Sequence, residues 1–206
     1  MTIYERALEL IEEKTIVGLG SGRASTEFIK LLGQKVQSGF QIQGVPTSQT
    51  SDDLARELGI PLLTLREALD AGGIDVTVDG ADEVDSNLDL IKGYGRALIR
   101  EKIVAAASRR LVILVGDGKS VPNLGSKGKL PVEVVPFALP LVETATRRIG
   151  LNPVLWLKDD QPAKTDNGNY ILDCGLSPVD DAQALELDLL SIPGVVGTGL
   201  FLGMAS

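Results

Sequence analysis

The stretch TIVGLGSGRASTEFIKLL, residues 15–32, carries the signals that decide the fold. Its first five residues, Thr15 to Leu19, are mostly apolar and rich in β-branched side chains, which favours a buried strand. Glycines then interrupt the pattern at Gly20 and Gly22, and apolar side chains return at helical spacing from Phe28 onward. The stretch therefore predicts a strand, a glycine-rich turn and a helix, which together form one repeat of an α/β fold.

The same alternation continues on both sides of this repeat. Apolar periodicity predicts helices at 3–14, 52–58 and 97–107, and apolar runs predict strands at 42–45, 60–65, 74–78 and 111–115. Strands that alternate with helices favour a parallel sheet covered on both faces. We therefore expect an α/β protein with a Rossmann-like, mostly parallel sheet flanked by helices.

The pattern changes near Pro131, where a smaller α+β lobe is expected. The sequence there predicts strands at 132–135, 154–157 and 170–172, helices at 139–149 and 180–190, and a hairpin turn at Asn167-Gly168. Residues 194–202 are apolar enough to return to the main sheet. We expect 1–130 and 197–206 to form the catalytic α/β domain, and 131–196 the small lobe.

Composition limits the class of protein. The chain has 206 residues, a net charge of −8 and one cysteine, Cys174, so no disulfide can form within it. The negative charge argues against a nucleic-acid partner. No apolar run approaches the roughly 18 residues of a membrane span. Four glutamates among the first fourteen residues are unlike a leader peptide. These features favour a cytoplasmic protein.

Positive charge is concentrated in one part of this acidic chain. The segment from Lys92 to Lys129 contains nine basic and two acidic residues. Arg109 and Arg110 could simply complement the C-terminus of a helix. Lysines that lie among glycines, such as Lys119, fit that explanation less well. A basic region on an acidic protein suggests a small anionic ligand, of which phosphate is the commonest kind.

The first polar loop after a predicted strand reads GLGSGRAS, residues 18–25. Free backbone N–H groups and the dipole of the following helix would favour an anion there. A tight strand–helix turn without a ligand would explain the same glycines. The spacing matches neither the GxGxxG dinucleotide fingerprint nor a Walker A loop.

The second polar loop, DGADEVDSN at residues 79–87, follows an apolar strand. It could bind a metal, form a solvated acidic loop or hold an active-site carboxylate pair. The spacing of its acids differs from that of an EF-hand. Asp79 is the stronger candidate for chemistry because it comes directly after the strand, whereas Glu83 and Asp85 could simply face water.

The segment KGYGRALIREK, residues 92–102, adds a lysine beside glycines and a glutamate on a predicted helix. The neighbours of Glu101 on its helix face are Ala97, Leu98 and Ala105. A carboxylate on such a face loses water and becomes a stronger base, and the chain has no histidine for that task. Glu101 could instead be an exposed residue with an ion-pair partner, and Lys92 an ordinary surface lysine.

At these motifs the chain resembles the type A family of ribose-5-phosphate isomerases. The matching stretches run in family order through nearly the whole sequence: Asp79–Glu83, Ile91–Gly93, Arg100–Lys102, Lys119, Pro131–Val134, Thr165–Asn169 and Ile192–Val196. The resemblance implies an isomerase of the pentose phosphate pathway that interconverts D-ribose 5-phosphate and D-ribulose 5-phosphate through an enediol(ate). It also implies that no metal or cofactor takes part, and that the protein is a homodimer.

The resemblance further implies roles for particular residues. Glu101 would be the base that moves a proton between C2 and C1 of the sugar. Asp79 would assist ring opening and move protons between O1 and O2, with Asp82 close by. Lys92 would stabilise the developing oxyanion. The substrate and its phosphate would be held by Ser21, Gly22, Arg23, Ala24, Ser25, Gly80, Ala81, Gly93, Tyr94, Gly95 and Lys119.

Two features depart from the family pattern. The phosphate turn is typically TGST, whereas Ser21 to Ala24 read SGRA and lose two hydroxyl groups. Family members also usually continue for about one more strand and a short tail beyond the position of Ser206, which leaves two alternatives: an incomplete edge of the main sheet, or a truncated sequence. Two rival functions remain open on the sequence: a coenzyme A transferase with a glutamate nucleophile, and a non-catalytic sugar-phosphate sensor.

Overall fold

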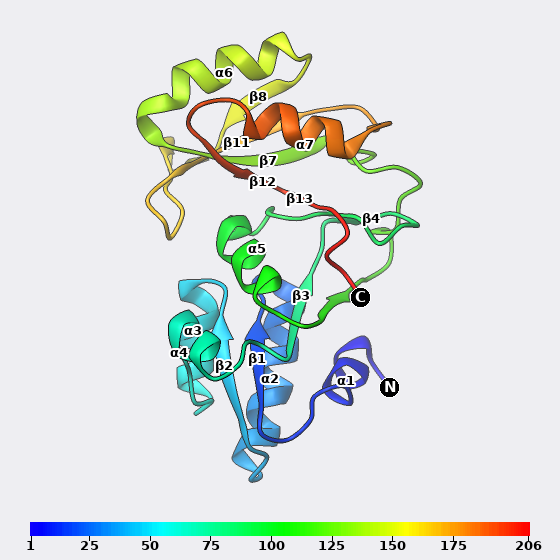
Figure 1. Cartoon of the computed structure of the whole chain (residues 1–206), viewed down its shortest axis with the longest axis vertical. Helices are drawn as coiled ribbons and strands as arrows, with labels where there is room; N and C mark the ends of the chain where they lie inside the picture. Colours follow the sequence, from blue (N-terminus) through cyan, green and yellow to red (C-terminus); the bar gives the residue numbers. More distant parts are fainter. The chain divides into compact units, whose positions relative to one another are not determined.

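The computed structural model describes all 206 residues, which divide into two compact units (Figure 1). The first unit contains residues 1–80, 100–116 and 204–206, and the second contains 81–99 and 117–203. These boundaries differ from those of the expected lobes, because 81–99, 117–130 and 197–203 group with the second unit. No helix is both long enough and apolar enough to cross a membrane.

The first unit is built on a four-stranded parallel sheet with the strand order β2-β1-β3-β6. Its strands are β1 (Thr15–Leu19), β2 (Ile42–Pro46), β3 (Val76–Gly80) and β6 (Leu111–Leu114). Its helices are α1 (Ile3–Leu8), α2 (Arg23–Gln37), α3 (Gln49–Glu57), α4 (Leu65–Asp70) and most of α5 (Leu98–Ala106). The predicted α/β class and parallel sheet are confirmed.

The core of this unit follows from the apolar pattern of its strands. Val17, Leu19 and Val78 are fully buried, and they pack with Phe28 and Ile29 of α2. Burial of such side chains is the main driving force for folding, at roughly 25 cal/mol per Å² of apolar surface. The packing fixes α2 to the sheet, and it thereby fixes the glycine turn that joins β1 to α2.

Two local predictions in this unit are wrong. Residues 60–65 were expected to form a strand, but only Leu62 makes a single bridge, to Gly44, and α4 begins at Leu65. Thr64 caps that helix, because its side chain accepts a hydrogen bond from the N–H of Glu67. The first helix also ends at Leu8 rather than near residue 14.

The second unit is an α+β assembly around an antiparallel sheet with the order β12-β7-β11-β8. The strands of this sheet are β7 (Lys129–Val134), β8 (Asn152–Leu155), β11 (Tyr170–Gly175) and β12 (Val195–Thr198), with helices α6 (Leu139–Arg148) and α7 (Ala182–Leu190) and the 3-10 turn η1 (Pro136–Ala138). Shorter strands are β4 (Glu83–Val84), β5 (Leu90–Ile91), β9 (Leu157–Lys158), β10 (Gln161–Pro162) and β13 (Leu200–Phe201).

The expected return of residues 194–202 to the main sheet is wrong. β12 pairs antiparallel with β7, and β13 pairs antiparallel with β5 in a separate three-stranded sheet, β13-β5-β4. The apolar side chains of the segment complete this unit instead, since Leu200 is buried in the same cluster as Leu130 and Val132. Hydrophobicity alone predicted burial correctly but could not identify the pairing partner.

Candidate active site

The carboxyl ends of β1 and β3 lie side by side in the first unit. Leu19 is in register with Val78, and the N–H of Gly20 donates to the carbonyl of Val78 at 3.0 Å. The glycine turn after β1 and Asp79 near the end of β3 therefore meet at one edge of the sheet. Ligands of parallel α/β sheets bind at this edge.

Asp79 is held tightly at this edge. Its side chain is buried, and Oδ1 accepts hydrogen bonds from the N–H of Ser21 at 3.1 Å, the hydroxyl of Ser25 at 2.9 Å and the N–H of Gly80 at 2.7 Å. A Cβ atom at Gly20 would lie 2.3 Å from Oδ1 of Asp79, so only glycine allows this approach. The carboxylate therefore has a fixed orientation.

The hydroxyl of Ser21 belongs to a cluster that the sequence analysis missed. Ser21 Oγ lies 2.7 Å from Thr47 Oγ1, 2.7 Å from Ser48 Oγ and 3.2 Å from Ser51 Oγ. Ser51 Oγ in turn donates to the carbonyl of Gly20 at 2.7 Å. This cluster could have been predicted from the hydroxyl-rich segment directly after β2, because that segment lies at the edge where polar side chains were already expected.

The first turn of α2 retains the features of an anion site. Gly22 is the N-cap with φ of 88°, no side chain caps the helix, and no acidic residue lies in its first turn. Arg23 is exposed and Ala24 is half-buried. The N-terminal N–H groups of a helix favour negative charge. The SGRA turn can therefore offer backbone N–H groups and an arginine, although it lacks two hydroxyls of the family pattern.

Glu101 lies in the first turn of α5 and is only 3% exposed. The C-terminal end of α5 lies at the start of β3, because the N–H of Arg109 donates to the carbonyl of Ile74 at 2.9 Å. The first turn therefore points toward the opposite edge, where β3 ends. Val104 faces Gly18 of β1, and a residue three positions earlier shares its face of the helix. Glu101 thus faces the sheet near the edge that holds Asp79.

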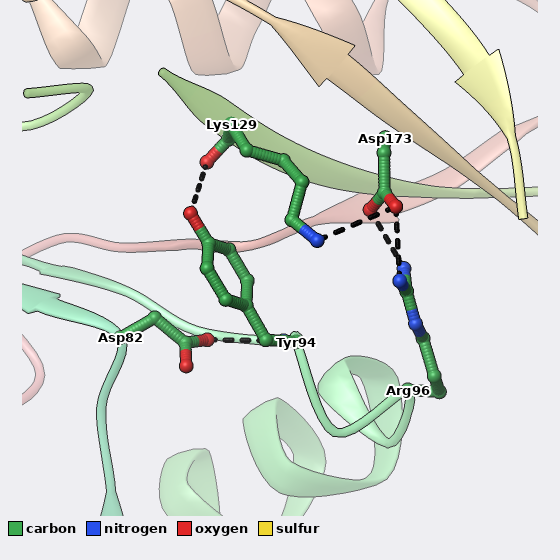
Figure 2. Close-up of polar contacts among 5 residues, drawn as sticks. All are labelled: Asp82, Tyr94, Arg96, Lys129 and Asp173. Carbon is green, nitrogen blue, oxygen red and sulfur yellow. Dashed lines mark hydrogen bonds and ion pairs between the residues drawn. The ribbon is translucent and has the colours of Figure 1, made fainter. Parts of the chain in front are cut away.

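The second unit carries the other predicted carboxylate, Asp82. Its Oδ2 accepts a hydrogen bond from the N–H of Tyr94 at 3.0 Å (Figure 2). Burial raises the pKa of Asp82 above its ordinary value, while the Tyr94 N–H and the ammonium groups of Lys92, Lys119 and Lys129 act in the opposite direction. Three ammonium groups therefore offset only part of the effect of burial on Asp82.

Lys92 is buried in the second unit, with an exposed fraction of 3%. Its ammonium lies 5.4 Å from the centre of the Phe201 ring, within the range of a cation–π contact. The backbone N–H of Lys92 donates to the carbonyl of Gly199 at 2.8 Å. A Cβ atom at Gly199 would lie 2.2 Å from the carbonyl oxygen of Lys92. Gly199 therefore fixes the backbone of this lysine, a role that the sequence analysis missed.

The remaining predicted substrate contacts in the second unit lie around these two side chains. Ala81 is buried, Gly95 is exposed, and Gly93 has φ of 105°, which only glycine adopts readily. Lys119 is partly exposed, and its carbonyl accepts a hydrogen bond from the N–H of Val84 at 2.9 Å. Lys119 thus contributes positive charge that acts on Asp82.

The suggestion that Glu83 could face water is wrong. Its side chain is fully buried and accepts hydrogen bonds from the N–H groups of Gly125 at 2.7 Å and Lys127 at 2.8 Å. Asp85 is half-buried and accepts from the N–H of Asn87 at 2.8 Å, so it shapes its own turn. No group of three acidic, histidine or cysteine side chains is arranged to hold a metal ion.

The predicted site residues thus fall into two sets. The first unit brings together the turn 21–25, Asp79 and Gly80 at the carboxyl edge of its sheet, and it also contains Glu101 on α5. The second unit brings together Asp82 with the lysines and the loop 92–95.

Comparisons with known proteins identify the group to which this chain is similar. The sequence model of the family "Ribose 5-phosphate isomerase A (phosphoriboisomerase A)" matches residues 43–206. Ribose-5-phosphate isomerase A of Sinorhizobium fredii is 48% identical, over 98% of this chain and 88% of its own. The protein of the same name from Gloeobacter violaceus is 46% identical, over 100% of this chain and 88% of its own.

A solved structure supports the same assignment. A D-ribose-5-phosphate isomerase in complex with phospho-erythronic acid superposes with a TM-score of 0.94 and 40% identity, over 99% of this chain and 90% of that protein. Such a score indicates the same fold throughout, and the identity is far above that of chance resemblance. The chain belongs to the ribose 5-phosphate isomerase A family.

Proposed function

We propose that this chain interconverts D-ribose 5-phosphate and D-ribulose 5-phosphate, with Glu101 as the base. The observation that carries the proposal is the burial of two carboxylates in the first unit, one near the end of β3 and one on α5. Glu101 is 3% exposed in the first turn of α5, and Asp79 is 1% exposed near the end of β3. Buried carboxylates at the ligand edge of a parallel sheet are costly unless they take part in chemistry.

The reaction moves one proton between carbon atoms and one between oxygen atoms. Glu101 removes the proton from C2 of the open-chain aldose, and the electron pair forms the C1–C2 double bond of the enediol(ate). The same carboxylic acid then returns the proton to C1, while the hydroxyl proton passes from O2 to O1. The product is the ketose, and the enzyme is regenerated without any redox partner.

Asp79 is suited to the transfer between the oxygen atoms. The three hydrogen bonds to its Oδ1 fix the plane of the carboxylate, so the group can meet O1 and O2 of the sugar without reorganisation. Asp79 also assists ring opening, since the furanose must release its O1 proton before C2 becomes acidic. Asp82 lies at the start of the second unit and supports the same transfers.

Lys92 stabilises the negative charge that develops on oxygen in the transition state. Its ammonium lies in a buried setting against Phe201 rather than in bulk water. A positive charge in such a setting acts more strongly on a developing oxyanion than a solvated lysine would. The turn 21–25, Gly80, Ala81, the loop 93–95 and Lys119 are the proposed contacts of the sugar and its phosphate.

Proton NMR of ribose 5-phosphate in deuterated water tests this function directly. Added protein should produce ribulose 5-phosphate with deuterium at C1, because Glu101 exchanges its proton with solvent between the two transfers. Absence of any turnover would favour a sugar-phosphate sensor, and an acyl or coenzyme A adduct on Glu101 detected by mass would favour a transferase. Family membership supports the isomerase over both rivals.

The assembly and location follow as further parts of the proposal. Phe137 is 96% exposed and Leu141 is 53% exposed, which suits a surface covered by a second copy of the chain in a homodimer. Phe137→Asp should shift the mass measured by light scattering from dimer to monomer. The single cysteine, Cys174, is buried and outside any disulfide, which suits a cytoplasmic enzyme.

A further inference from the structure

Arg96 adopts a backbone conformation that arginine rarely takes. Its φ is 69°, in the left-handed region, and its N–H closes a turn on the carbonyl of Gly93 at 3.0 Å. A side chain raises the free energy of this conformation relative to glycine. Its persistence here therefore requires that interactions of the arginine side chain select it.

Those interactions are made with the small sheet of the same unit. Arg96 Nη1 donates to Asp173 Oδ1 at 2.6 Å and Nη2 donates to Asp173 Oδ2 at 2.9 Å, a two-pronged pair (Figure 2). Both side chains are largely buried, with exposed fractions of 17% and 18%. The guanidinium also lies 4.9 Å from the centre of the Trp156 ring. A bidentate ion pair with a carboxylate, combined with stacking on an aromatic ring, is among the strongest interactions that arginine makes.

A second connection runs from Asp173 back to the same loop. Lys129 Nζ lies 3.4 Å from Asp173 Oδ2 and 4.1 Å from the centre of the Tyr94 ring, and Tyr94 Oη donates to the carbonyl of Lys129 at 3.2 Å. The N–H of Tyr94 then reaches Asp82 at 3.0 Å. Figure 2 shows these contacts as one continuous chain from Arg96 to Asp82.

We infer that the Arg96–Asp173 pair is a clamp that fixes the loop 92–96 and thereby holds the N–H of Tyr94 on the carboxylate of Asp82. The inference rests on the proposed function, in which Asp82 and Lys92 act on the sugar phosphate. Arg96 and Asp173 are positioning residues, because they act through the loop. Lys92 is the first residue of this loop and Asp82 accepts the N–H of Tyr94, so a shift of the loop displaces Lys92 and breaks the contact with Asp82.

A merely structural ion pair would have a different effect from a clamp. Loss of a structural pair would lower thermal stability and leave the kinetics of the folded protein unchanged. Loss of a clamp would free Tyr94 from Asp82 and remove a hydrogen bond that lowers the pKa of that carboxyl group. The charged groups acting on Asp82, namely Lys92, Lys119 and Lys129, would remain in both cases.

Arg96→Gly is the variant that separates these two explanations. Glycine accepts the left-handed backbone without strain, so the gain in backbone energy offsets part of the lost ion pair, and the fold should be kept. We expect kcat/KM to fall about 10- to 100-fold, as when a catalytic group is misplaced. We also expect the acid limb of its pH profile to move to higher pH, and Arg96→Lys to lie between this variant and the wild type.

The matched control is Arg109→Gln. Arg109 pairs with Asp75 at 3.1 Å on the surface of the first unit, with 69% of its side chain exposed. The kinetics and the pH profile of this variant should equal those of the wild type.

A readout independent of turnover completes the test. Hydrogen exchange of the Tyr94 amide should be at least about tenfold faster in Arg96→Gly than in the wild type, since the N–H loses its acceptor. Unchanged exchange together with an unchanged pH profile would overturn the clamp, even if activity fell. An inactive wild type that shows the expected exchange difference would reject the proposed function and keep the clamp.

Discussion

The hydroxyl of Ser25 donates a hydrogen bond to Oδ1 of Asp79 at 2.9 Å, and both side chains are almost completely buried. The bond joins the first turn of α2 to the end of β3, so a helix residue helps to orient the proposed proton-transfer group. Bonds to a charged acceptor contribute more than neutral ones, typically about 1.5–3 kcal/mol.

Removal of this hydroxyl should therefore slow the reaction. We expect Ser25→Ala to lower kcat about 5- to 50-fold with little change in KM, because Asp79 keeps two backbone donors but loses the bond that fixes its rotation. Steady-state kinetics measures the effect. Ser38→Ala is the control on the same helix, since its hydroxyl only donates to the carbonyl of Lys35 at the exposed C-terminal end. An equal loss in both variants would show that α2, and not Asp79, was perturbed.

Replacement of the proposed base separates binding from chemistry. Glu101→Gln keeps the size and polarity of the buried side chain but cannot accept the C2 proton. We expect kcat to fall by at least about 10³-fold, while calorimetry still detects ribose 5-phosphate binding with a similar Kd. Glu27→Gln alters an exposed glutamate paired with Lys30 and should leave both quantities unchanged. Substantial turnover by Glu101→Gln would remove this residue from the role of base.

The close approach of Gly20 to Asp79 predicts a different outcome. In Gly20→Ala the new methyl group would lie 2.3 Å from Asp79 Oδ1 and 2.6 Å from the carbonyl of Val78, so the turn or β3 must move. We expect a loss of about 2 kcal/mol or more in the free energy of unfolding, together with loss of activity. Gly116→Ala, where no atom lies within 4 Å of the added group, should unfold like the wild type in urea.

The sequence predicted local features, such as the burial of single side chains, better than the pairing of distant segments. Asp79 was found because a carboxylate directly after an apolar strand marks the ligand edge of a parallel sheet. The burial of Glu101 was inferred correctly from its apolar neighbours at helical spacing. Such features are local, and a period of 3.6 or 2 residues is enough to recognise them.

Non-local features could not be obtained in this way. The local sequence around Glu83 is compatible with a side chain that faces water. Its burial depends on the N–H groups of Gly125 and Lys127, which lie 42 and 44 positions away. The segment at β12 and β13 is apolar and fits any sheet, so its antiparallel pairing with β7 and β5 depends on tertiary packing. The cluster around Ser21 likewise joins hydroxyl groups from α3 and from Thr47, the residue directly after β2.

The raised pKa of Asp82 gives a prediction about pH. For an acid, a higher pKa in the folded state means that the folded protein holds its proton longer than the unfolded chain does. Stability therefore falls as pH rises from the ordinary aspartate value toward the folded one. We expect Asp82→Asn to melt at a higher temperature than the wild type at pH 7.5, while kcat/KM falls about 100-fold.

The same variant should lose its stability advantage in acid. Below the ordinary pKa of aspartate both states of the wild type are protonated, so the two melting temperatures should converge near pH 4. Melting curves followed by circular dichroism between pH 4 and 8 measure the difference. A constant difference across this range would mean that burial of the Asp82 charge is not its cause.

The stability of the second unit should depend strongly on Glu133. Its fully buried Oε1 accepts hydrogen bonds from Thr165 at 3.0 Å, Asn167 at 3.1 Å and Asn169 at 2.9 Å, so one carboxylate of β7 holds the whole turn before β11. Glu133→Ala would leave three donors without their acceptor, and we expect a loss of about 3 kcal/mol and a fall in Tm of roughly 6–12 °C. Glu133→Gln keeps an acceptor oxygen and should lose less. Glu143→Ala, which breaks a surface pair with Arg147, should change the stability by no more than about 0.5 kcal/mol. Equal melting temperatures for the two alanine variants would show that the turn holds its shape without Glu133.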